Sequence, residues 1–166
     1  MRAALIVSVV AIALALAIAA GASVASAAGG SIAHHEITAG SRGANLPGER
    51  LRDVGRVLRS RADATRVLGK WGLDRAAVKG VDFKRRSLIV VLANYRPSAG
   101  YRASVASVVV RGGEAVVTAD VRFEAAGKLV AQDLERPWVV VAVKRADVAR
   151  VRPEVRVRTR GAAPAR

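Results

Sequence analysis

The sequence predicts an α+β domain that is mainly β, with an antiparallel sheet folded as a sandwich or partly closed barrel and one packed helix. Two observations support this prediction. About seven short runs rich in β-branched residues follow one another, separated by turns, as in antiparallel sheets. One stretch, residues 60–71, has apolar residues at helical spacing. The 166 residues suffice for one domain with a substantial core.

An apolar N-terminus precedes this domain. Residues 1–27 combine one basic residue, a long apolar run and the small-residue step Ala25-Ser26-Ala27, which is typical of a signal peptide cut after Ala27. The alternative is an uncleaved anchor, because residues 3–33 carry no charge and could span a bilayer. Either way, we expect the domain to be exported to the periplasm, the cell envelope or the medium.

Residues 28–48 are rich in Gly, Ala and Ser and show no sustained period, which predicts a flexible linker. This segment contains His34 and His35. Adjacent side chains do not converge easily on a metal ion, and the chain has no Cys to complete a ligand set. We therefore expect a solvated histidine pair and no metal site. The β-rich domain is expected over residues 49–160, followed by a disordered tail, 161–166.

The domain should begin with an irregular strand over 50–59, followed by its helix. Ser60 and Asp63 stand at capping-box spacing. One helical face then carries Ala64, Val67, Leu68 and Trp71. Gly72 should end the helix, and residues 73–80 should form a loop with one helical turn.

The run Leu88 to Ala93 is continuously apolar and bounded by charge and Pro/Gly, which predicts a strand buried on both faces. A polar loop, 94–100, follows it. Residues 101–110 and 115–124 alternate as strands, with a hairpin turn at Arg111-Gly112-Gly113-Glu114 between them.

The last third of the chain should contain a turn at 125–128, a strand candidate at 129–134 and a strongly apolar strand at 138–143. Between the last two, Glu135-Arg136-Pro137 is predicted to be an exposed loop, because Pro does not fit a central strand.

A polar crossover over 144–152 should then lead to a final strand, 154–160. Its arginine ladder, Arg156, Arg158 and Arg160, is typical of a charge-protected edge strand. The alternative is that these arginines contact phosphates.

The residue types argue against catalysis. With no Cys and both histidines in the expected linker, a Ser or Cys nucleophile lacks a folded base. Asp120 and Glu124 share one strand face, but outward carboxylates there are usually solvated. We expect no enzyme activity, no catalytic residues and no cofactor.

Charge suggests a partner only in general terms. The formal charge of +15, or +14 once Arg2 is removed with the signal peptide, favours an anionic envelope polymer or membrane surface as an alternative partner. Aromatic residues make up 4% of the chain, too few for interleaved stacking platforms, so no specific nucleic-acid binding is expected.

Four short motifs stand out along the domain: Val81-Asp82-Phe83, Arg96 to Tyr101, Gln132-Asp133-Leu134 and Pro137 to Val141. Together, over roughly residues 56–158, they resemble the PrcB C-terminal domain family, subunits associated with a bacterial surface protease complex. Ala99 departs from the family's usual Gly-Gly-Tyr. The resemblance implies a non-enzymatic domain that binds or stabilises a protein partner, plausibly a secreted or surface protease.

Two predicted loops carry the candidate site. The expected partner-binding residues are Arg96, Pro97, Ser98, Ala99, Gly100, Glu135, Arg136 and Pro137, and the expected structural residues are Asp82, Phe83, Tyr101 and Trp138. The same loops are loosely similar to those of chagasin-type cysteine-protease inhibitors, which implies a protease inhibitor as an alternative. Two ordinary turns over buried aromatics are a further alternative. We expect the Tyr101 ring to be buried against residues 88–93 or Trp138, with its hydroxyl near the surface.

Overall fold

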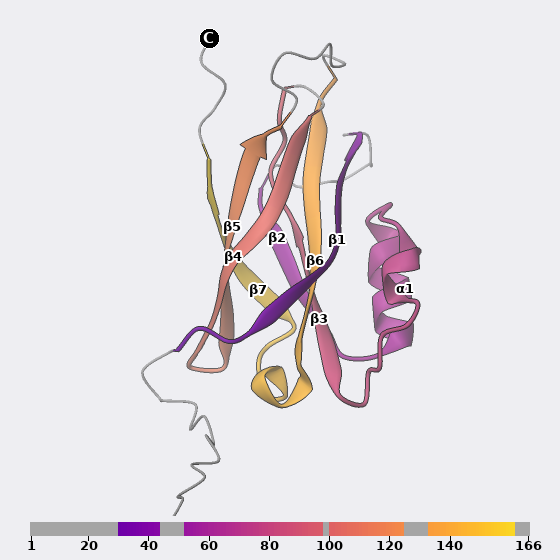
Figure 1. The fold of residues 1–166 in the computed structure, drawn as a ribbon, viewed down its shortest axis with the longest axis vertical. Coiled ribbons are helices and arrows are strands. Elements are labelled where there is room, and N and C mark those ends of the chain that lie inside the picture. The colour runs from indigo at the N-terminus through magenta and orange to yellow at the C-terminus, as the bar shows by residue number, and fades with distance from the viewer. Residues whose placement is uncertain (1–29, 44–51, 98–99, 125–132, 162–166) are drawn as a thin grey trace, which may run out of the picture.

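The computed structural model describes residues 30–43, 52–97, 100–124 and 133–161, which form one sheet with a helix packed on it (Figure 1). Its strands are β1 (His34–Gly43), β2 (Val54–Leu58), β3 (Arg86–Leu92), β4 (Tyr101–Arg111), β5 (Glu114–Phe123), β6 (Glu135–Lys144) and β7 (Glu154–Arg160). Helix α1 (Arg61–Lys70) follows β2, and the 3-10 turns η1 (Arg75–Val78) and η2 (Arg145–Val148) precede β3 and β7. The predicted mainly β, α+β class is confirmed.

The strands form a seven-stranded sheet in the order β1-β6-β3-β2-β7-β5-β4. Every neighbouring pair is antiparallel except β5 and β7, which run parallel. The expectation of a wholly antiparallel sheet is therefore wrong at this one pair. The chain leaves β5, runs through β6 and η2, and returns beside β5 in the same direction, a crossover that short-turn reasoning does not anticipate.

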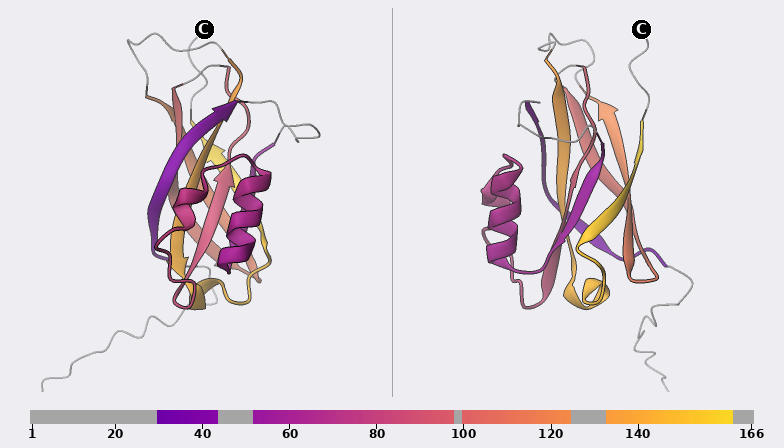
Figure 2. Two further views of the ribbon diagram at one scale, coloured as in Figure 1. Left: turned by 90° about the vertical axis from the view of Figure 1, so that its right-hand side faces the viewer. Right: turned by 180° about the vertical axis from the view of Figure 1, so that it is seen from behind.

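The two ends of the sheet order meet and nearly close a barrel (Figures 1 and 2). Ser31 bridges Val109, and the Ile32 N–H donates to the Val108 carbonyl (2.8 Å). Beyond Ile32, side chains rather than backbone groups join β1 to β4. The His34 imidazole donates from Nε2 to the Val105 carbonyl (3.0 Å), and Arg102 pairs with Glu36 (2.5 Å).

The apolar residues gather in two cores on opposite sides of β3 and β6. Ile89 and Val91 lie in the core inside the barrel, whereas Leu88, Val90 and Leu92 lie in the core beneath the helix. All five are at most 1% exposed. This explains why the run from Leu88 is continuously apolar: alternate side chains enter different cores, and neither face meets water.

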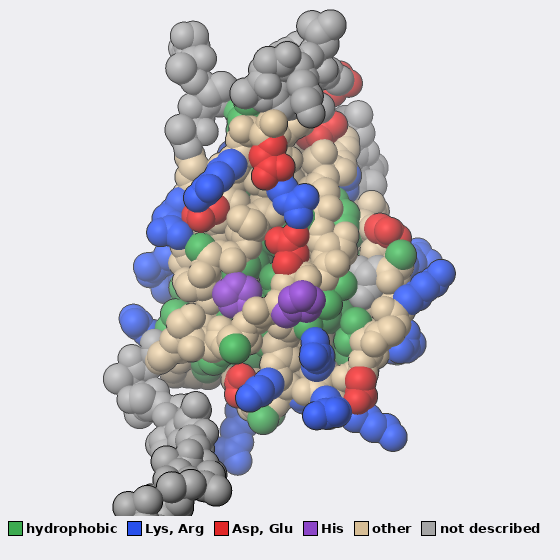
Figure 3. Space-filling model, in the orientation of Figure 1, with side chains coloured by type: hydrophobic (Ala, Val, Ile, Leu, Met, Phe, Trp, Pro, Cys, Tyr) green, Lys and Arg blue, Asp and Glu red, His purple; other side chains and the backbone are tan. Residues whose placement is uncertain are grey.

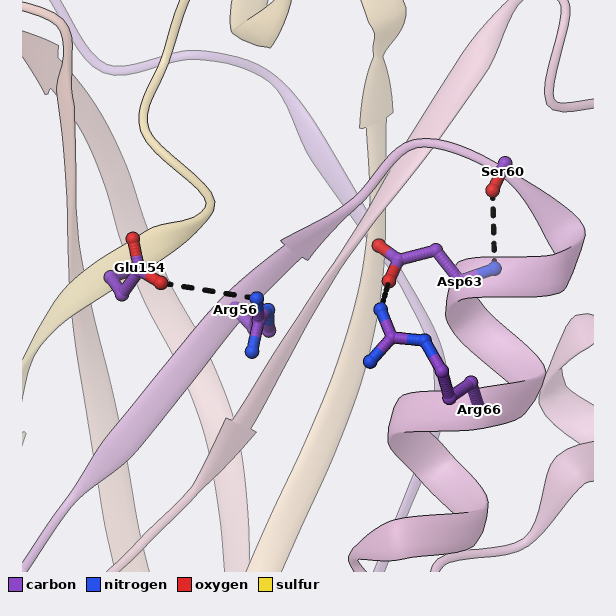
Figure 4. A network of polar contacts seen from close by, with 5 residues as sticks. All are labelled: Arg56, Ser60, Asp63, Arg66 and Glu154. Atoms are coloured by element: carbon purple, nitrogen blue, oxygen red, sulfur yellow. Dashed lines mark hydrogen bonds and ion pairs between the residues drawn. The ribbon is translucent and has the colours of Figure 1, made fainter.

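Helix α1 covers one face of the sheet (Figure 2). The Asp63 N–H donates to the Ser60 side chain (3.1 Å), so the predicted N-cap is present, and the Asp63 carboxylate pairs with Arg66 (Figure 4). Ala64, Val67 and Leu68 are buried beneath the helix, as its periodicity predicted.

Residues 34–43 form β1, so the linker predicted over 28–48 is wrong there. β1 pairs with β6 from His34–Val143 to Gly43–Glu135, with a bulge at Ile37. Its glycines misled the prediction. A Cβ on Gly40 would lie 3.0 Å from the Trp138 ring, so Gly40 is small because an indole packs over it.

Two further expectations need correction. His34 is half-buried and hydrogen-bonded rather than solvated, whereas His35 on the opposite face of the strand is exposed. β7 is not an edge strand, because it lies between β2 and β5. Two of its arginines pair with carboxylates of β5: Arg156 with Glu114 and Arg160 with Asp120 (3.2 and 3.0 Å).

Of the remaining predictions, one is confirmed and the others fall on residues that the structure does not describe. The hairpin is confirmed, since Gly112 and Gly113 both have positive φ (54° and 74°), as a type I′ turn requires. The segments predicted as a signal peptide and as the turn at 125–128, and most of the strand candidate at 129–134, lie outside the described residues. No helix in the described part of the chain is long and apolar enough to cross a membrane.

Candidate functional site

Four segments that are distant in sequence meet at one end of the barrel, where β3 and β5 end and β4 and β6 begin (Figure 1). We call this surface the loop end and define it by residues 94–97, 100–101, 123–124 and 133–136. Arg96 and Glu135 pair through their backbones, each N–H donating to the other's carbonyl (2.8 and 3.0 Å). The two loops predicted to carry the site therefore lie side by side.

Arg136 and Pro137 are buried in β6, so the exposed loop predicted over 135–137 is wrong. The side chain of Arg136 supports the backbone here. The Pro137 carbonyl accepts from the Ala93 N–H (2.8 Å), but Pro has no N–H with which to complete the pair. Arg136 Nε donates to the Ala93 carbonyl instead (2.8 Å), and its Nη2 donates to the Arg52 carbonyl (2.7 Å).

A proline inside β6 is tolerated for this reason. It lies where β3 has just ended, and the preceding side chain supplies the missing donor. Arg136, only 1% exposed, is thus a framework residue whose side chain is buried beneath this surface. The Arg136 guanidinium also lies over the Tyr95 ring, 5.1 Å from its centroid.

Asp53 anchors the first of the two loops, a role that the sequence analysis missed. Its carboxylate accepts from the Asn94 N–H (2.7 Å) and from the Thr159 hydroxyl (2.9 Å). It thereby joins the approach to β2, the loop after β3 and the end of β7. The sequence signal was one acidic residue among the arginines of 50–59.

Tyr101 lies beneath the loop end with 4% of its surface exposed, in the core with Ile89 and Val91. Its predicted burial is confirmed. Gly100 has φ 97°, which allows the chain to turn sharply before it. The predicted place of the hydroxyl is wrong, because it is buried and has no hydrogen-bond partner among the described residues. Ala99 lies outside them.

The outer surface of the loop end is partly apolar. Phe123 and Leu134 are 39% and 59% exposed, and they are the exposed large hydrophobic residues of the described chain. The Phe123 ring lies 5.1 Å from that of Tyr101, and Leu134 directly precedes the Arg96–Glu135 bridge. Neither was among the predicted site residues. No signal in the sequence identified them, because strand alternation places Phe123 in phase with the buried residues Val117, Ala119 and Val121.

The predicted site residues therefore have different roles. Pro97 is exposed, Arg96, Gly100 and Glu135 are half-buried, Arg136 and Pro137 are buried, and Ser98 and Ala99 lie outside the described residues. The Glu135 carboxylate accepts a hydrogen bond from Ser41 of β1.

The predicted structural residues keep their roles. Asp82 accepts the Lys84 N–H (2.9 Å), Phe83 packs against the core beneath the helix, and Trp138 is buried in it. A chagasin-like wedge is not supported, since Arg136 to Trp138 are strand. Among the described residues, no three of His, Asp and Glu gather as a metal site would require.

Comparison with known proteins agrees with the main resemblance. The family model described as PrcB C-terminal matches residues 87–144, which run from β3 to the end of β6 and include both segments bridged by Arg96 and Glu135. No curated protein and no solved structure matches the chain. The matched family indicates a domain associated with a protease complex.

Proposed function

We propose that this chain is an exported, non-enzymatic protein-binding domain that contacts a protease or another subunit of a protease complex through the loop end. The family match over residues 87–144 supports the class of partner. Export is inferred from the signal-like pattern of residues 1–27.

One observation carries the choice of surface. Two exposed apolar side chains, Phe123 and Leu134, lie at the loop end, where Phe123 packs on Tyr101 and Leu134 directly precedes the Arg96–Glu135 bridge. The chain just before Arg96 is fixed by side chains, because the Arg136 guanidinium donates to the Ala93 carbonyl and the Asp53 carboxylate accepts the Asn94 N–H. Exposed apolar residues on a rigid base are common at protein interfaces, because little entropy is lost when they are covered.

The proposal predicts that the double variant Phe123→Ser, Leu134→Ser loses its partner. The full chain is immobilised and exposed to envelope extract from its own source, and bound proteins are identified by mass spectrometry. The parent should retain a protease or protease-complex subunit. The double variant should bind that partner at least about tenfold more weakly, since it lacks the two apolar side chains that the partner would cover.

A control variant tests whether the partner is instead attracted by the positive charge of the whole domain. Arg111→Ser, Arg150→Ser removes two large exposed side chains near the opposite end of the barrel and should bind as the parent does. Weaker binding by the control than by the double variant would overturn the choice of surface. Recovery of no protease component by the parent would overturn the proposed class of partner.

A further inference from the structure

A groove of about 590 Å³ lies at the other end of β6, away from the loop end. Four cationic side chains line it: Lys79, Arg85, Arg86 and Lys144. We call it the basic groove. Its apolar part includes Ile37 and Ala142, and one carboxylate, that of Asp82, also borders it. Figure 3 shows Lys and Arg side chains gathered at the lower end of the front face, below the two histidines.

The sheet register places two of these cations directly opposite each other. Arg86 at the start of β3 pairs with Lys144 at the end of β6. Like charges opposite one another on neighbouring strands repel, so this placement costs stability unless an anion lies between them. Among the described residues, no carboxylate lies within ion-pair distance of any of the four cations.

The loop before β3 is held rigidly beside this pair. The Asp82 carbonyl accepts from the N–H groups of Arg85 and Arg86 (3.2 and 2.9 Å), and the Arg85 carbonyl accepts from the Arg145 N–H (2.9 Å). The Asp82 carboxylate itself accepts from the Lys84 N–H (2.9 Å). The chain therefore presents its cations from a fixed backbone, which lowers the entropic cost of binding an anion.

The basic groove continues toward the exposed histidine. A smaller hollow of about 180 Å³ shares Arg86, Ala142 and Lys144 with it and is also lined by His34 and His35. The combined surface offers several donors around a small apolar area. Its size is typical of a site for a small molecule.

We propose that the basic groove binds a small anion that carries more than one phosphate group. Arg forks and Lys ammonium groups are the side chains that recognise phosphate oxygens, and four of them surround one space. Two of the β7 arginines differ, since Arg156 and Arg160 already pair with carboxylates. The site is independent of the loop end and of the partner proposed there.

Calorimetric titration of the full chain with inorganic tripolyphosphate tests this site at about 150 mM salt, where long-range attraction is screened. The parent should bind it at one site. The double variant Arg86→Gln, Lys144→Gln should weaken binding by about tenfold or more, because it removes the facing pair. The control Arg111→Gln, Arg158→Gln loses the same charge elsewhere and should stay within about twofold of the parent.

Two further probes distinguish the source and class of the anion. Vesicles containing phosphatidic acid present the same phosphate chemistry on a lipid. Competition between tripolyphosphate and these vesicles would support the same groove with a lipid headgroup as its source, and its absence would support a soluble phosphate. Equal loss of affinity in both double variants, no binding at this salt concentration, or tighter binding of polyglutamate than of tripolyphosphate would overturn the proposal.

Discussion

At the scale of single residues, the hydroxyl of Tyr101 is buried without a hydrogen-bond partner in the described part of the chain. A buried polar group that lacks a partner costs free energy, so Tyr101→Phe should leave the stability unchanged or raise it by up to about 1 kcal/mol. Tyr101→Ala should lose about 3–5 kcal/mol, because it empties a large volume in the core. Urea denaturation of the three proteins measures both effects.

Arg96→Ala is the comparison for Tyr101. Its guanidinium lies 5.9 Å from the centre of the Tyr101 ring, but the side chain is only half-buried. Loss of the Arg96 side chain should lower the stability by no more than about 1 kcal/mol.

One outcome would contradict the prediction for Tyr101. If Tyr101→Phe were destabilised by more than about 1 kcal/mol, the hydroxyl would have a partner and its assignment as unsatisfied would be wrong.

At the scale of elements, β6 depends on Arg136. Arg136→Met keeps most of the apolar stem but leaves the carbonyls of Ala93 and Arg52 without its donors. We expect a loss of stability on the order of 3 kcal/mol, since several buried hydrogen bonds to a charged group disappear together. Thermal and urea denaturation measure it.

Arg158→Met is the matched control on β7, where the same change is made on an exposed face. It should alter stability by no more than about 0.5 kcal/mol. Equal behaviour of the two variants would show that Arg136 is not part of the framework of β6.

At the scale of the whole molecule, β1 completes the barrel. A chain that begins at residue 44 loses β1, one of the two strands that pair with β6, and the seam that joins β1 to β4. Ile32, Ile37 and Ala39, which pack against the two cores, are also removed. We expect a loss of at least about 3 kcal/mol, and a melting temperature lower by about 10 °C or more.

A chain that begins at residue 30 keeps β1 and is the control for this truncation. It should melt as the longer chain does, as measured by circular dichroism on heating. Equal melting of the two truncated chains would instead support the linker expected from composition.

The candidate site could be predicted in part. Pro and aromatic residues that follow strands identified the two candidate segments, and the structure places Arg96 of one beside Glu135 of the other. Which side chains face outward could not be predicted. Pro137 argued for a loop, because the rule against proline in a strand cannot anticipate that a neighbouring arginine supplies the missing donor. Phe123 and Leu134 lacked any motif.

By itself the sequence determined the elements whose signal is local. Periodicity and capping located helix α1, the continuous apolar run located β3, and two glycines located the hairpin, since each depends on residues a few positions apart. Only the tertiary structure decided that 34–43 is a strand, that β7 lies inside the sheet beside β5, and that Arg86 faces Lys144. The physical reason is that strand pairing joins residues far apart in the chain. Its energy comes from partners that no local pattern specifies.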